Sequence, residues 1–471
     1  MLYSHDHQTI VAQCTPTGSG AIALLRISGT DAIEIVSQIA VLPSKQKLTD
    51  LPSHTIHFGS VVDQNNELID QVMFMVMHAP KTFTGQNTIE ITCHNNPFII
   101  QSIIDQIIAH GARPAQEGEF TKRAVLNNKI DLIQAETIND LIHAHTKVAL
   151  KKTLAQLTGT LSHAITIIEK NLLQAIALSE ASFEFIDDEI TFDDQIRTII
   201  NAVLNDIAHI KKDFSQQQQI RDGVRIAIIG SVNAGKSSLF NALLGKNRAI
   251  VTNIAGTTRD SIEAGIYHSN YYLTLVDTAG LRQTDDIIEQ EGIIRSFEQA
   301  ALADIILLVF DSAALLSDQE QTVYADLIDK YENKIIKVFN KSDIAVRPFF
   351  DSVRPEFIDM SGVALAKTEG FSVSSKTGQN IPELENQIEE KVTQLFANAS
   401  SPFLLNTRQF NLIQSIEKKL FAIQEQYSEQ ISHELISSDL NDALACLSEL
   451  TGKDVSEKMM DAIFKEFCIG K

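Results

Sequence analysis

The amino-acid sequence predicts a multidomain fold, in which an α/β domain is inserted into an all-α domain that follows an N-terminal α+β domain. The chain has 471 residues, which suggests roughly three domains. Strand-like apolar runs mark its beginning and its middle, and apolar residues recur every three or four positions on both sides of the middle. The expected segments are 1–120, 121–217, 218–395 and 396–471, of which the second and fourth form one helical domain.

The N-terminal segment has the mixed pattern of an α+β domain. The expected strands are Thr9–Gln13, Ala21–Arg26, Val72–Met77 and Thr88–Thr92. Helical stretches at Asp31–Ala40 and Phe98–His110 lie between and after them. This pattern by itself assigns no function to the domain.

The helical domain is expected from apolar stripes before and after the insertion. One long amphipathic helix is predicted by Leu154, Leu157, Leu161, Ile165, Ile168, Leu172 and Ile176. The pattern returns in Phe410 to Ile423, Leu440 to Leu447 and Met459 to Phe467. Such stripes are far more often bundle core than sites of chemistry. Polar stretches at Gln216–Ile220 and Asn398–Pro402 are the expected hinges of the insertion.

Composition limits the classes of partner. The net charge is 39 − 60 = −21, so long-range repulsion opposes general binding to nucleic acid, and an RNA contact needs a local basic patch or a partner. No apolar run approaches the ~18 residues of a membrane span, and the first residues lack a signal-peptide pattern. The four cysteines are scattered. We expect a cytoplasmic protein with no membrane partner, disulfide framework or zinc site.

The stretch Gly230-Ser-Val-Asn-Ala-Gly-Lys-Ser237 lies between the strand pattern Val224–Ile229 and the helix pattern Ser238–Leu244. This is the context of a phosphate-binding P-loop. Its glycines let backbone N–H groups curl around phosphate oxygens, and the following helix adds its positive dipole end. Lys236 would reach the β- and γ-phosphates, and Ser237 would give a hydroxyl to Mg²⁺. The flanking strand and helix make a simple glycine turn the weaker alternative.

Three later segments follow in the order used by guanine-nucleotide domains. They are Asp277–Gly280, Asn340–Asp343 and Ser374–Lys376, the first two each after a strand-like run. Asp277 can hold the Mg²⁺ shell, and the Gly280 amide can contact the γ-phosphate. The Asp343 carboxylate can accept two hydrogen bonds from guanine that adenine cannot offer. Asn340 would face the other edge of the base, and the Lys341 stem would cover its ring.

Two further places bear on hydrolysis: the loop between the P-loop and Asp277, and the residue that follows Gly280. Thr258, or its neighbour Thr257, can complete Mg²⁺ coordination when the γ-phosphate is present. Ras-like enzymes carry a water-orienting Gln directly after the Asp-x-x-Gly segment, but this chain has Leu281. Hydrolysis is then negligible, or another group positions the water. The candidates are Arg282, Gln283, Asp285, Asp286 and Glu289. Asn233 of the P-loop could also hold a monovalent cation beside the phosphates.

The expected GTP-binding residues come from all these segments. They are Asn233, Ala234, Gly235, Lys236, Ser237, Ser238, Thr252, Asn253, Ile254, Ala255, Gly256, Thr257, Thr258, Asp277, Thr278, Ala279, Gly280, Asn340, Lys341, Asp343, Ser374, Ser375 and Lys376. The set predicts a guanine-nucleotide domain with Mg²⁺ ligands Ser237 and Thr258, and the leading interpretation is a GTP hydrolase. The alternative is an RNA-binding regulatory GTPase switch, such as a ribosome-assembly factor, which would share the same nucleotide-binding residues.

Several motifs that lie far apart in the sequence match the pattern of one protein family. They are Thr9–Pro16 with Leu25–Gly29, Gly118–Ala124 with Asn128–Leu132, and the ending Phe467–Lys471. With a GTPase domain inserted into a helical domain, the whole chain resembles the MnmE (TrmE) family of tRNA-modification GTPases. The Cys-Ile-Gly-Lys ending is the most specific of these motifs. The resemblance implies a Ras-like α/β P-loop GTPase domain and a folate-binding N-terminal domain.

For function, the resemblance implies a homodimer that works with the flavoprotein MnmG, in a heterotetramer or larger complex, on the wobble uridine of certain tRNAs. The pair would install an aminomethyl or carboxymethylaminomethyl group at carbon 5. The carbon would come from 5,10-methylenetetrahydrofolate, with 5-formyltetrahydrofolate as an analogue, and MnmG would contribute FAD and use NADH. The acidic net charge fits a tRNA surface supplied largely by MnmG. The alternative switch gives the N-terminal domain no folate.

The resemblance also implies roles for single residues. The folate-binding residues would be Arg26, Glu90, Lys129 and Lys471, in an N-terminal domain that also dimerises. The K⁺ ligands would be Asn233, Thr252, Ile254 and Thr257. Glu289 would be the catalytic acid that orients water, Cys468 would take part in the modification, and pairing of two GTPase domains would activate K⁺-stimulated hydrolysis. Two segments depart from the family pattern: Gly18–Ala21 has fewer glycines, and His94–Pro97 has Asn-Asn where Gly-Gly is usual.

Overall fold

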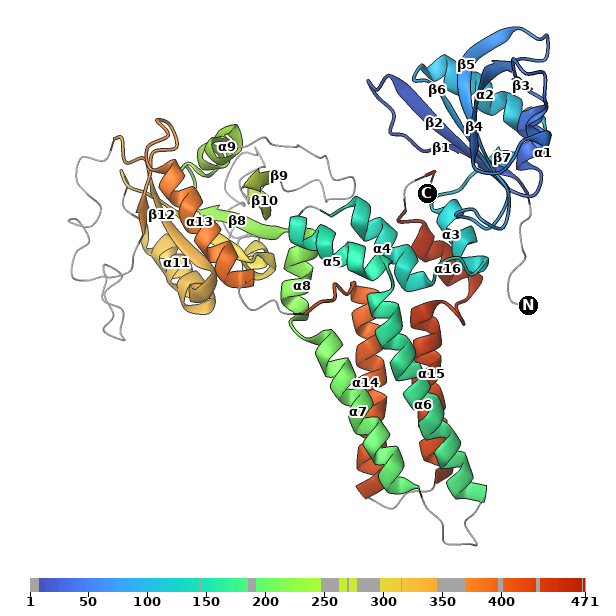
Figure 1. Ribbon diagram of the computed structural model, residues 1–471. Helices are drawn as coiled ribbons and strands as arrows, with labels where there is room; N and C mark the ends of the chain where they lie inside the picture. Colours follow the sequence, from blue (N-terminus) through green and yellow to red (C-terminus); the bar gives the residue numbers. More distant parts are fainter. Residues whose placement is uncertain are drawn as a thin grey trace. The chain divides into compact units, whose positions relative to one another are not determined.

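The computed structural model describes residues 8–144, 146–184, 192–246, 262–268, 271–277, 297–314, 316–344, 370–396, 401–428, 433–467 and 469–470. These residues divide into two compact units. The first consists of Met1–Ile142, Ala155–Ala208 and Thr407–Lys471, and the second of His143–Leu154 and His209–Asn406. The predicted fold class is confirmed, because the first unit contains an α+β part and a helical part and the second an α/β part (Figure 1).

The described N-terminal residues form a seven-stranded sheet of order β3-β4-β5-β6-β2-β1-β7. In chain order the strands are β1 Ile10–Gln13, β2 Ile22–Ser28, β3 Ala40–Val41, β4 Thr55–Val62, β5 Leu68–Met77, β6 Thr88–His94 and β7 Arg113–Pro114. The helices α1 Ala32–Ser37 and α2 Pro97–Ala109 share one apolar core with the sheet. Leu25 and Ile27 of β2 belong to this core, so Arg26 between them points to the opposite face.

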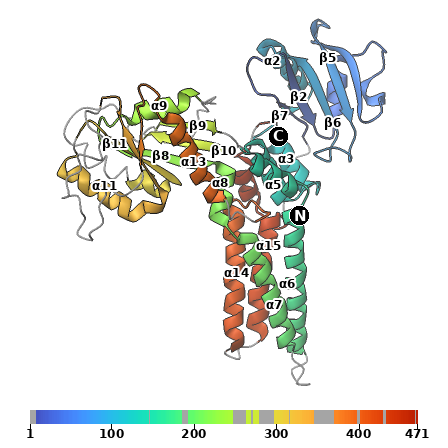
Figure 2. The same cartoon turned by 60° about the vertical axis from the view of Figure 1, so that its left-hand side comes forward.

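The helical part of the first unit is built around long helices that run side by side in both views (Figures 1 and 2). They are α6 Thr160–Glu184, α7 Asp193–Lys211, α14 Thr407–Ser428 and α15 His433–Thr451. The shorter helices are α3 Glu119–Leu126, α4 Leu132–Ile142 and α16 Glu457–Phe464. α15 packs against both α6 and α14. Among the described residues, no helix combines the length and apolar character needed to cross a lipid bilayer.

Two sequence expectations about these helices are wrong. The single helix expected from Leu154 to Ile176 is two helices, α5 Lys147–Leu157 and α6, because the chain turns at Gly159, whose φ is 96°. The expected hinge Gln216–Ile220 lies inside α8 Phe214–Asp222. There the buried Gln217 side chain donates to Lys212 O and accepts from Leu405 N. The polar residues of this stretch therefore belong to a packed helix and do not form a solvated linker. Of the second expected hinge, Asn398–Ser400 lies outside the described residues.

The described strands of the second unit form a six-stranded sheet of order β13-β12-β11-β8-β10-β9. They are β8 Val224–Gly230, β9 Ile262–His268, β10 Tyr271–Asp277, β11 Ile305–Asp311, β12 Ile335–Asn340 and β13 Phe371–Ser372. All neighbours are parallel except β9 and β10. The helices α9 Lys236–Lys246 and α13 Ile381–Phe396 cover one face, and α11 Asp318–Tyr331 covers the other. Because parallel strands end at one edge, the loops after β8 and β12 meet there.

Candidate nucleotide-binding site

The loop 231–235 joins the carboxyl end of β8 to α9. Its backbone enters the left-handed region twice, with φ of 64° at Asn233 and 90° at Gly235. A Cβ at Gly235 would overlap the amide of Asn340, so this position requires glycine. Asn tolerates the left-handed region better than most residues. The loop therefore folds back on itself, as a backbone cradle for phosphate must.

The side chain of Lys236, the first residue of α9, folds back against this loop. Its Nζ donates hydrogen bonds to the carbonyl oxygens of Gly230 and Ser231, both at 2.8 Å. These contacts hold the ammonium beside the loop, where it can meet phosphate oxygens. Ser237 and Ser238 follow in the first turn of α9, where helical N–H groups lack intrahelical acceptors and attract anions. The residues present therefore fit a bound polyphosphate.

Asn340, at the end of β12, connects the P-loop with the segment Ser374–Lys376. Its Nδ2 donates to the Ala234 carbonyl at 3.0 Å, and its Oδ1 accepts from the backbone N and the Oγ of Ser375 at 3.1 and 2.8 Å. The side chain is buried, so these bonds hold the three motifs at fixed spacing. The structure thus brings together three of the segments that the sequence assigned to GTP. A contact between Asn340 and the base stays a prediction.

Asp343 lies beside the same segment and is exposed. Its Oδ1 accepts a hydrogen bond from Ser374 Oγ at 2.7 Å. This hydrogen bond is the main cause that holds the pKa of Asp343 below its ordinary value. The carboxylate is therefore ionised at neutral pH and can accept N–H donors. The neighbouring Lys341 has φ 64° and pairs with Asp311 at 2.6 Å.

Several predicted site residues lie outside the described residues. They are Thr252, Asn253, Ile254, Ala255, Gly256, Thr257, Thr258, Thr278, Ala279, Gly280, Glu289, Cys468 and Lys471. Asp277 ends β10, but its side chain is likewise outside the description. Of the predicted cation ligands, the structure describes Ser237 and Asn233. The complete Mg²⁺ and K⁺ sites therefore stay predictions.

A second candidate region lies on the face of the N-terminal sheet away from its core. Arg26 of β2 is the register partner of Glu90 of β6, and Arg26 Nε donates to Glu90 Oε1 at 2.8 Å. Both side chains are partly exposed. The Gly470 carbonyl accepts from Cys14 Sγ at 3.1 Å and from Arg26 Nη1 at 3.4 Å. The segment that leads to Lys471 therefore lies beside the Arg26–Glu90 pair, whose opposite charges fit a ligand with both acidic and N–H groups.

Another predicted folate residue, Lys129, contacts a different segment of the domain. Its Nζ donates to the carbonyl oxygen of Pro80 at 2.8 Å, and its stem lies beside Gly85. Arg26 thus contacts both Glu90 and Gly470, whereas Lys129, which follows α3, contacts the loop that precedes β6.

The two departures from the family pattern contact each other. Asn95 Nδ2 donates to the carbonyl oxygens of Gly18 and Gly20 at 2.8 and 2.9 Å. Asn96 is the N-cap of α2, where its side chain accepts from the backbone N of Phe98. Each Asn therefore supplies a hydrogen bond that a glycine could not. The loop Gly18–Ala21, which has fewer glycines, is thus held by hydrogen bonds from Asn95 of the other segment.

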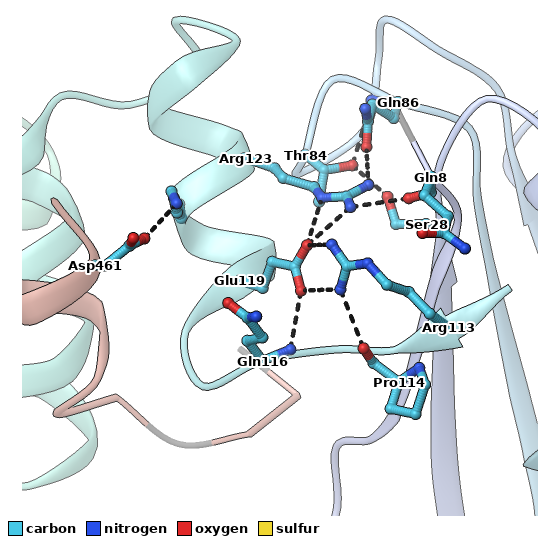
Figure 3. A network of polar contacts seen from close by, with 11 residues as sticks. Gln8, Ser28, Thr84, Gln86, Arg113, Pro114, Gln116, Glu119, Arg123 and Asp461 are labelled. Atoms are coloured by element: carbon cyan, nitrogen blue, oxygen red, sulfur yellow. Dashed lines mark hydrogen bonds and ion pairs between the residues drawn. The ribbon is translucent and has the colours of Figure 1, made fainter. Parts of the chain in front are cut away.

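Sequence reasoning missed a buried polar network between β7 and α3 (Figure 3). Glu119 accepts from both terminal nitrogens of Arg113 at 2.8 and 2.6 Å, and from Arg123 Nη2 at 2.8 Å. Arg123 also donates to Gln86 Oε1 at 3.0 Å and to the Gln8 carbonyl at 2.9 Å. Glu119 and Arg123 stand four residues apart in the motif Gly118–Ala124, which places them on one helix face. That spacing was the available signal.

The electrostatics of this network depend on its completeness. Glu119 and Arg123 are only 6% and 5% exposed. Burial alone would raise the pKa of Glu119, but hydrogen bonds from Arg113 and Gln116 and the charge of Arg123 outweigh it and lower that pKa. The carboxylate therefore stays ionised between two guanidinium groups. The network holds α3, and the loop that contains Gln86, against the N-terminal sheet.

Comparison with known proteins matches the whole chain. A model of the MnmE helical domain matches residues 132–468, and a model of the GTP-binding protein TrmE N-terminus matches residues 9–129. The tRNA modification GTPase MnmE of Christiangramia forsetii is 33% identical over 473 residues, covering 99% of each chain. That of Bacillus cereus is 35% identical over 477 residues, covering 99% of this chain and all of the relative. The solved G domain of the T. maritima FeoB iron transporter has a TM-score of 0.24, with 25% identity, and covers 36% of this chain and 98% of that one, too low a score for any conclusion.

Proposed function

Because the chain belongs to the MnmE family of tRNA-modification GTPases, we propose that its GTP hydrolysis is stimulated by K⁺ and activated when two GTPase domains pair. The hydrolysis serves a reaction carried out with MnmG, in a complex of two or more copies of each protein. That reaction installs an aminomethyl or carboxymethylaminomethyl group on carbon 5 of the wobble uridine of certain tRNAs. The one-carbon unit comes from 5,10-methylenetetrahydrofolate, and FAD and NADH act through MnmG.

In the nucleotide site, the chain's own groups bind, orient and discriminate. The Lys236 ammonium has three N–H donors, of which the Gly230 and Ser231 carbonyls take two, and the third reaches the β- and γ-phosphate oxygens of GTP. The amides at the start of α9 bind the same phosphates. The ionised Asp343 selects guanine. A Mg²⁺ ion held by Ser237 and Thr258 would neutralise phosphate charge.

The potassium proposal is carried by Asn233 together with Leu281 and Glu289. Leu281 occupies the place of the water-orienting Gln and cannot form a hydrogen bond through its side chain. Asn233 stands in the turn of the P-loop, with a side-chain carbonyl that suits an alkali cation. A K⁺ ion there, with Thr252, Ile254 and Thr257, would supply positive charge that other GTPases take from an arginine finger. Glu289 is the proposed water-orienting group.

Single-turnover GTP hydrolysis in KCl and in NaCl tests this proposal. The wild-type rate is expected to be much higher in KCl, and Asn233→Ala should remove the difference. Glu289→Ala should lower the KCl rate by about 10²-fold or more, since a positioned acid or base contributes that much. Glu291→Ala, two positions away, is the matched control. Equal rates in the two salts would refute the cation site, and an unchanged rate in Glu289→Ala would refute the catalytic assignment.

The folate proposal is supported by the Arg26–Glu90 pair, next to which the end of the chain lies. Cationic groups suit the glutamate tail of a folate, and a carboxylate suits the N–H donors of its pterin. Equilibrium binding of 5-formyltetrahydrofolate to the full chain tests it. Absence of binding would favour the alternative, a regulatory switch without folate chemistry. Analysis of wobble nucleosides from cells that lack the protein tests the tRNA modification itself.

A further inference from the structure

A buried tyrosine contacts the start of the P-loop. Tyr324 belongs to α11, and it is only 5% exposed. Its hydroxyl accepts a hydrogen bond from the backbone N of Ser231 at 2.7 Å and donates one to the Val309 carbonyl at 2.8 Å. One side chain thus links the P-loop to β11. No motif in the sequence pointed to this residue.

The two ends of one peptide unit are held by different groups. In the peptide that joins Gly230 to Ser231, the N–H donates to Tyr324, and the carbonyl of Gly230 accepts from Lys236 Nζ. Since a peptide is planar, fixing the direction of its N–H also fixes the direction of its C=O. The tyrosine hydroxyl therefore sets the direction of the Gly230 carbonyl, one of the two that hold the Lys236 ammonium.

The surrounding residues keep this arrangement from shifting. The Tyr324 ring stacks on Phe310, with centroids 4.7 Å apart, and Phe310 stacks on Phe339 at 5.1 Å. A Cβ at Gly230 would come within 2.5 Å of the Val309 carbonyl, so the peptide lies too close to β11 for any side chain there. Burial is the main cause that raises the pKa of Tyr324, so the hydroxyl keeps its proton at neutral pH and can donate to Val309.

We propose that Tyr324 is a positioning residue of the GTPase, which orients the Gly230–Ser231 peptide and through it the ammonium of Lys236. It does not touch the nucleotide. Its effect reaches the phosphates that Lys236 contacts, the β- and γ-phosphates, and leaves the α-phosphate, the ribose and the base alone. GDP and GMP separate these contributions, because GMP has neither phosphate that Lys236 contacts.

Tyr324→Phe keeps the ring and removes the hydroxyl, which leaves the Ser231 N–H buried without its acceptor. Competition of GDP and GMP against a fluorescent GDP analogue on the full chain measures both affinities. We expect GDP affinity to fall about tenfold, as for an unsatisfied buried donor, and GMP affinity to change less than about twofold. The matched control is Tyr331→Phe, which removes a hydroxyl from the same helix at the partly buried Tyr331. The control should change neither affinity.

A double-mutant cycle with Lys236→Ala isolates the route of the effect. In that background Tyr324→Phe should cost less than about twofold in GDP affinity, because the group it acts through is gone. Equal losses for GDP and GMP, an unchanged GDP affinity, or a full tenfold loss in the Lys236→Ala background would each overturn the proposal.

A measurement on the unmodified chain tests the proposal without relying on the folding of a variant. Residue-resolved amide hydrogen exchange without nucleotide should show the Ser231 N–H exchanging at least about 100-fold more slowly than an unstructured amide, as a closed hydrogen bond predicts. Unprotected exchange at Ser231 would show that Tyr324 does not hold this peptide, and would overturn the proposal whatever the variant does.

Discussion

The P-loop region and the Arg26 region hold their ligand-binding groups in opposite ways. In the P-loop, the Lys236 ammonium rests on two backbone carbonyls of its own loop, and neutral groups such as Asn340 and Tyr324 fix that loop. In the N-terminal domain, Arg26 and Glu90 neutralise each other across neighbouring strands. A phosphate at the first site would meet an ammonium held only by neutral acceptors, whereas a ligand at the second would have to compete with or join an existing ion pair. The first arrangement suits an anion, and the second suits a ligand that carries both acidic and N–H groups, in line with the proposed GTP and folate.

The largest effect is expected when the Lys236 ammonium is removed. Lys236→Ala should lower GTP hydrolysis by about 10²–10³-fold, the loss seen when one group that stabilises developing charge is removed. Single-turnover hydrolysis measures it. Lys334→Ala is the matched control, since Lys334 also donates to a backbone carbonyl, that of Ala303, in the same unit. If Lys334→Ala were equally damaging, the special position of Lys236 would be refuted.

The next effect concerns stability of the N-terminal domain. Glu119→Gln should lower the free energy of unfolding by about 3 kcal/mol, because it leaves the buried Arg123 without its counter-charge. Denaturant unfolding followed by circular dichroism measures it, with the exposed Glu117→Gln as control. Because the folded pKa of Glu119 is lowered, its stabilisation is complete above the ordinary pKa of 4.5 and is lost as pH falls through the folded value. A pH-independent difference between the two proteins would contradict this.

The Arg26 region can be tested without touching the nucleotide site. Glu90→Gln should weaken 5-formyltetrahydrofolate binding by about tenfold, because a charge-assisted hydrogen bond becomes a neutral one, and should leave GDP affinity unchanged. Isothermal titration measures both. Glu34→Gln, an exposed position in α1, is the control. Equal folate affinity in wild type and Glu90→Gln would remove Glu90 from the proposed pocket.

The smallest effect sharpens the role of Asp343. In Ser374→Ala the hydrogen bond that lowers the pKa of Asp343 is gone, so that pKa should rise. GDP affinity should change only a few-fold at neutral pH, where the carboxylate is ionised in both proteins, but its decline on acidification should begin at a higher pH in the variant. Titrations of GDP between pH 7 and pH 4 measure the profile. The exposed Ser372→Ala should follow the wild type.

The part of the site that the sequence predicted is the part encoded in short contiguous stretches. The P-loop glycine, Lys236 and Asn340–Asp343 follow from local backbone needs and strand ends, and the structure brings them together at one sheet edge. Tyr324 was missed because its partners, Ser231 and Val309, stand 93 and 15 residues away on other elements. Glu119 was missed although Arg123 is four residues away, because the spacing does not show that the pair is buried or that Arg113 of β7 joins it. The Arg26–Glu90 pair could be named only through family resemblance, since strand pairing brings together residues 64 positions apart.

Fold class was predictable from periodicity, but some boundaries were not. β4 went unrecognised, because its apolar residues change sides: Ile56 and Phe58 are exposed, whereas Val61 is buried. A register irregularity between Val61 and Val62 accompanies this strand. Gly159 interrupted an apolar stripe that continued through the turn, so period alone suggested one helix. At Gly159 a local backbone feature overrode a regular pattern, whereas in β4 the apolar residues lie on both faces, so their spacing did not reveal the strand.

The first unit is formed from three separate stretches of the chain, which affects how it can fold during synthesis. The apolar side of α6 is buried against α15, yet the whole stretch His209–Asn406 lies between them and must be synthesised first. At about 5–20 residues per second, that stretch occupies the ribosome for roughly 10–40 s. During this interval α6 lacks the α15 surface against which it packs in the folded unit, where Ile165, Ile168 and Leu172 are buried. We expect newly made chains to depend on chaperones that shield such surfaces until translation is nearly finished.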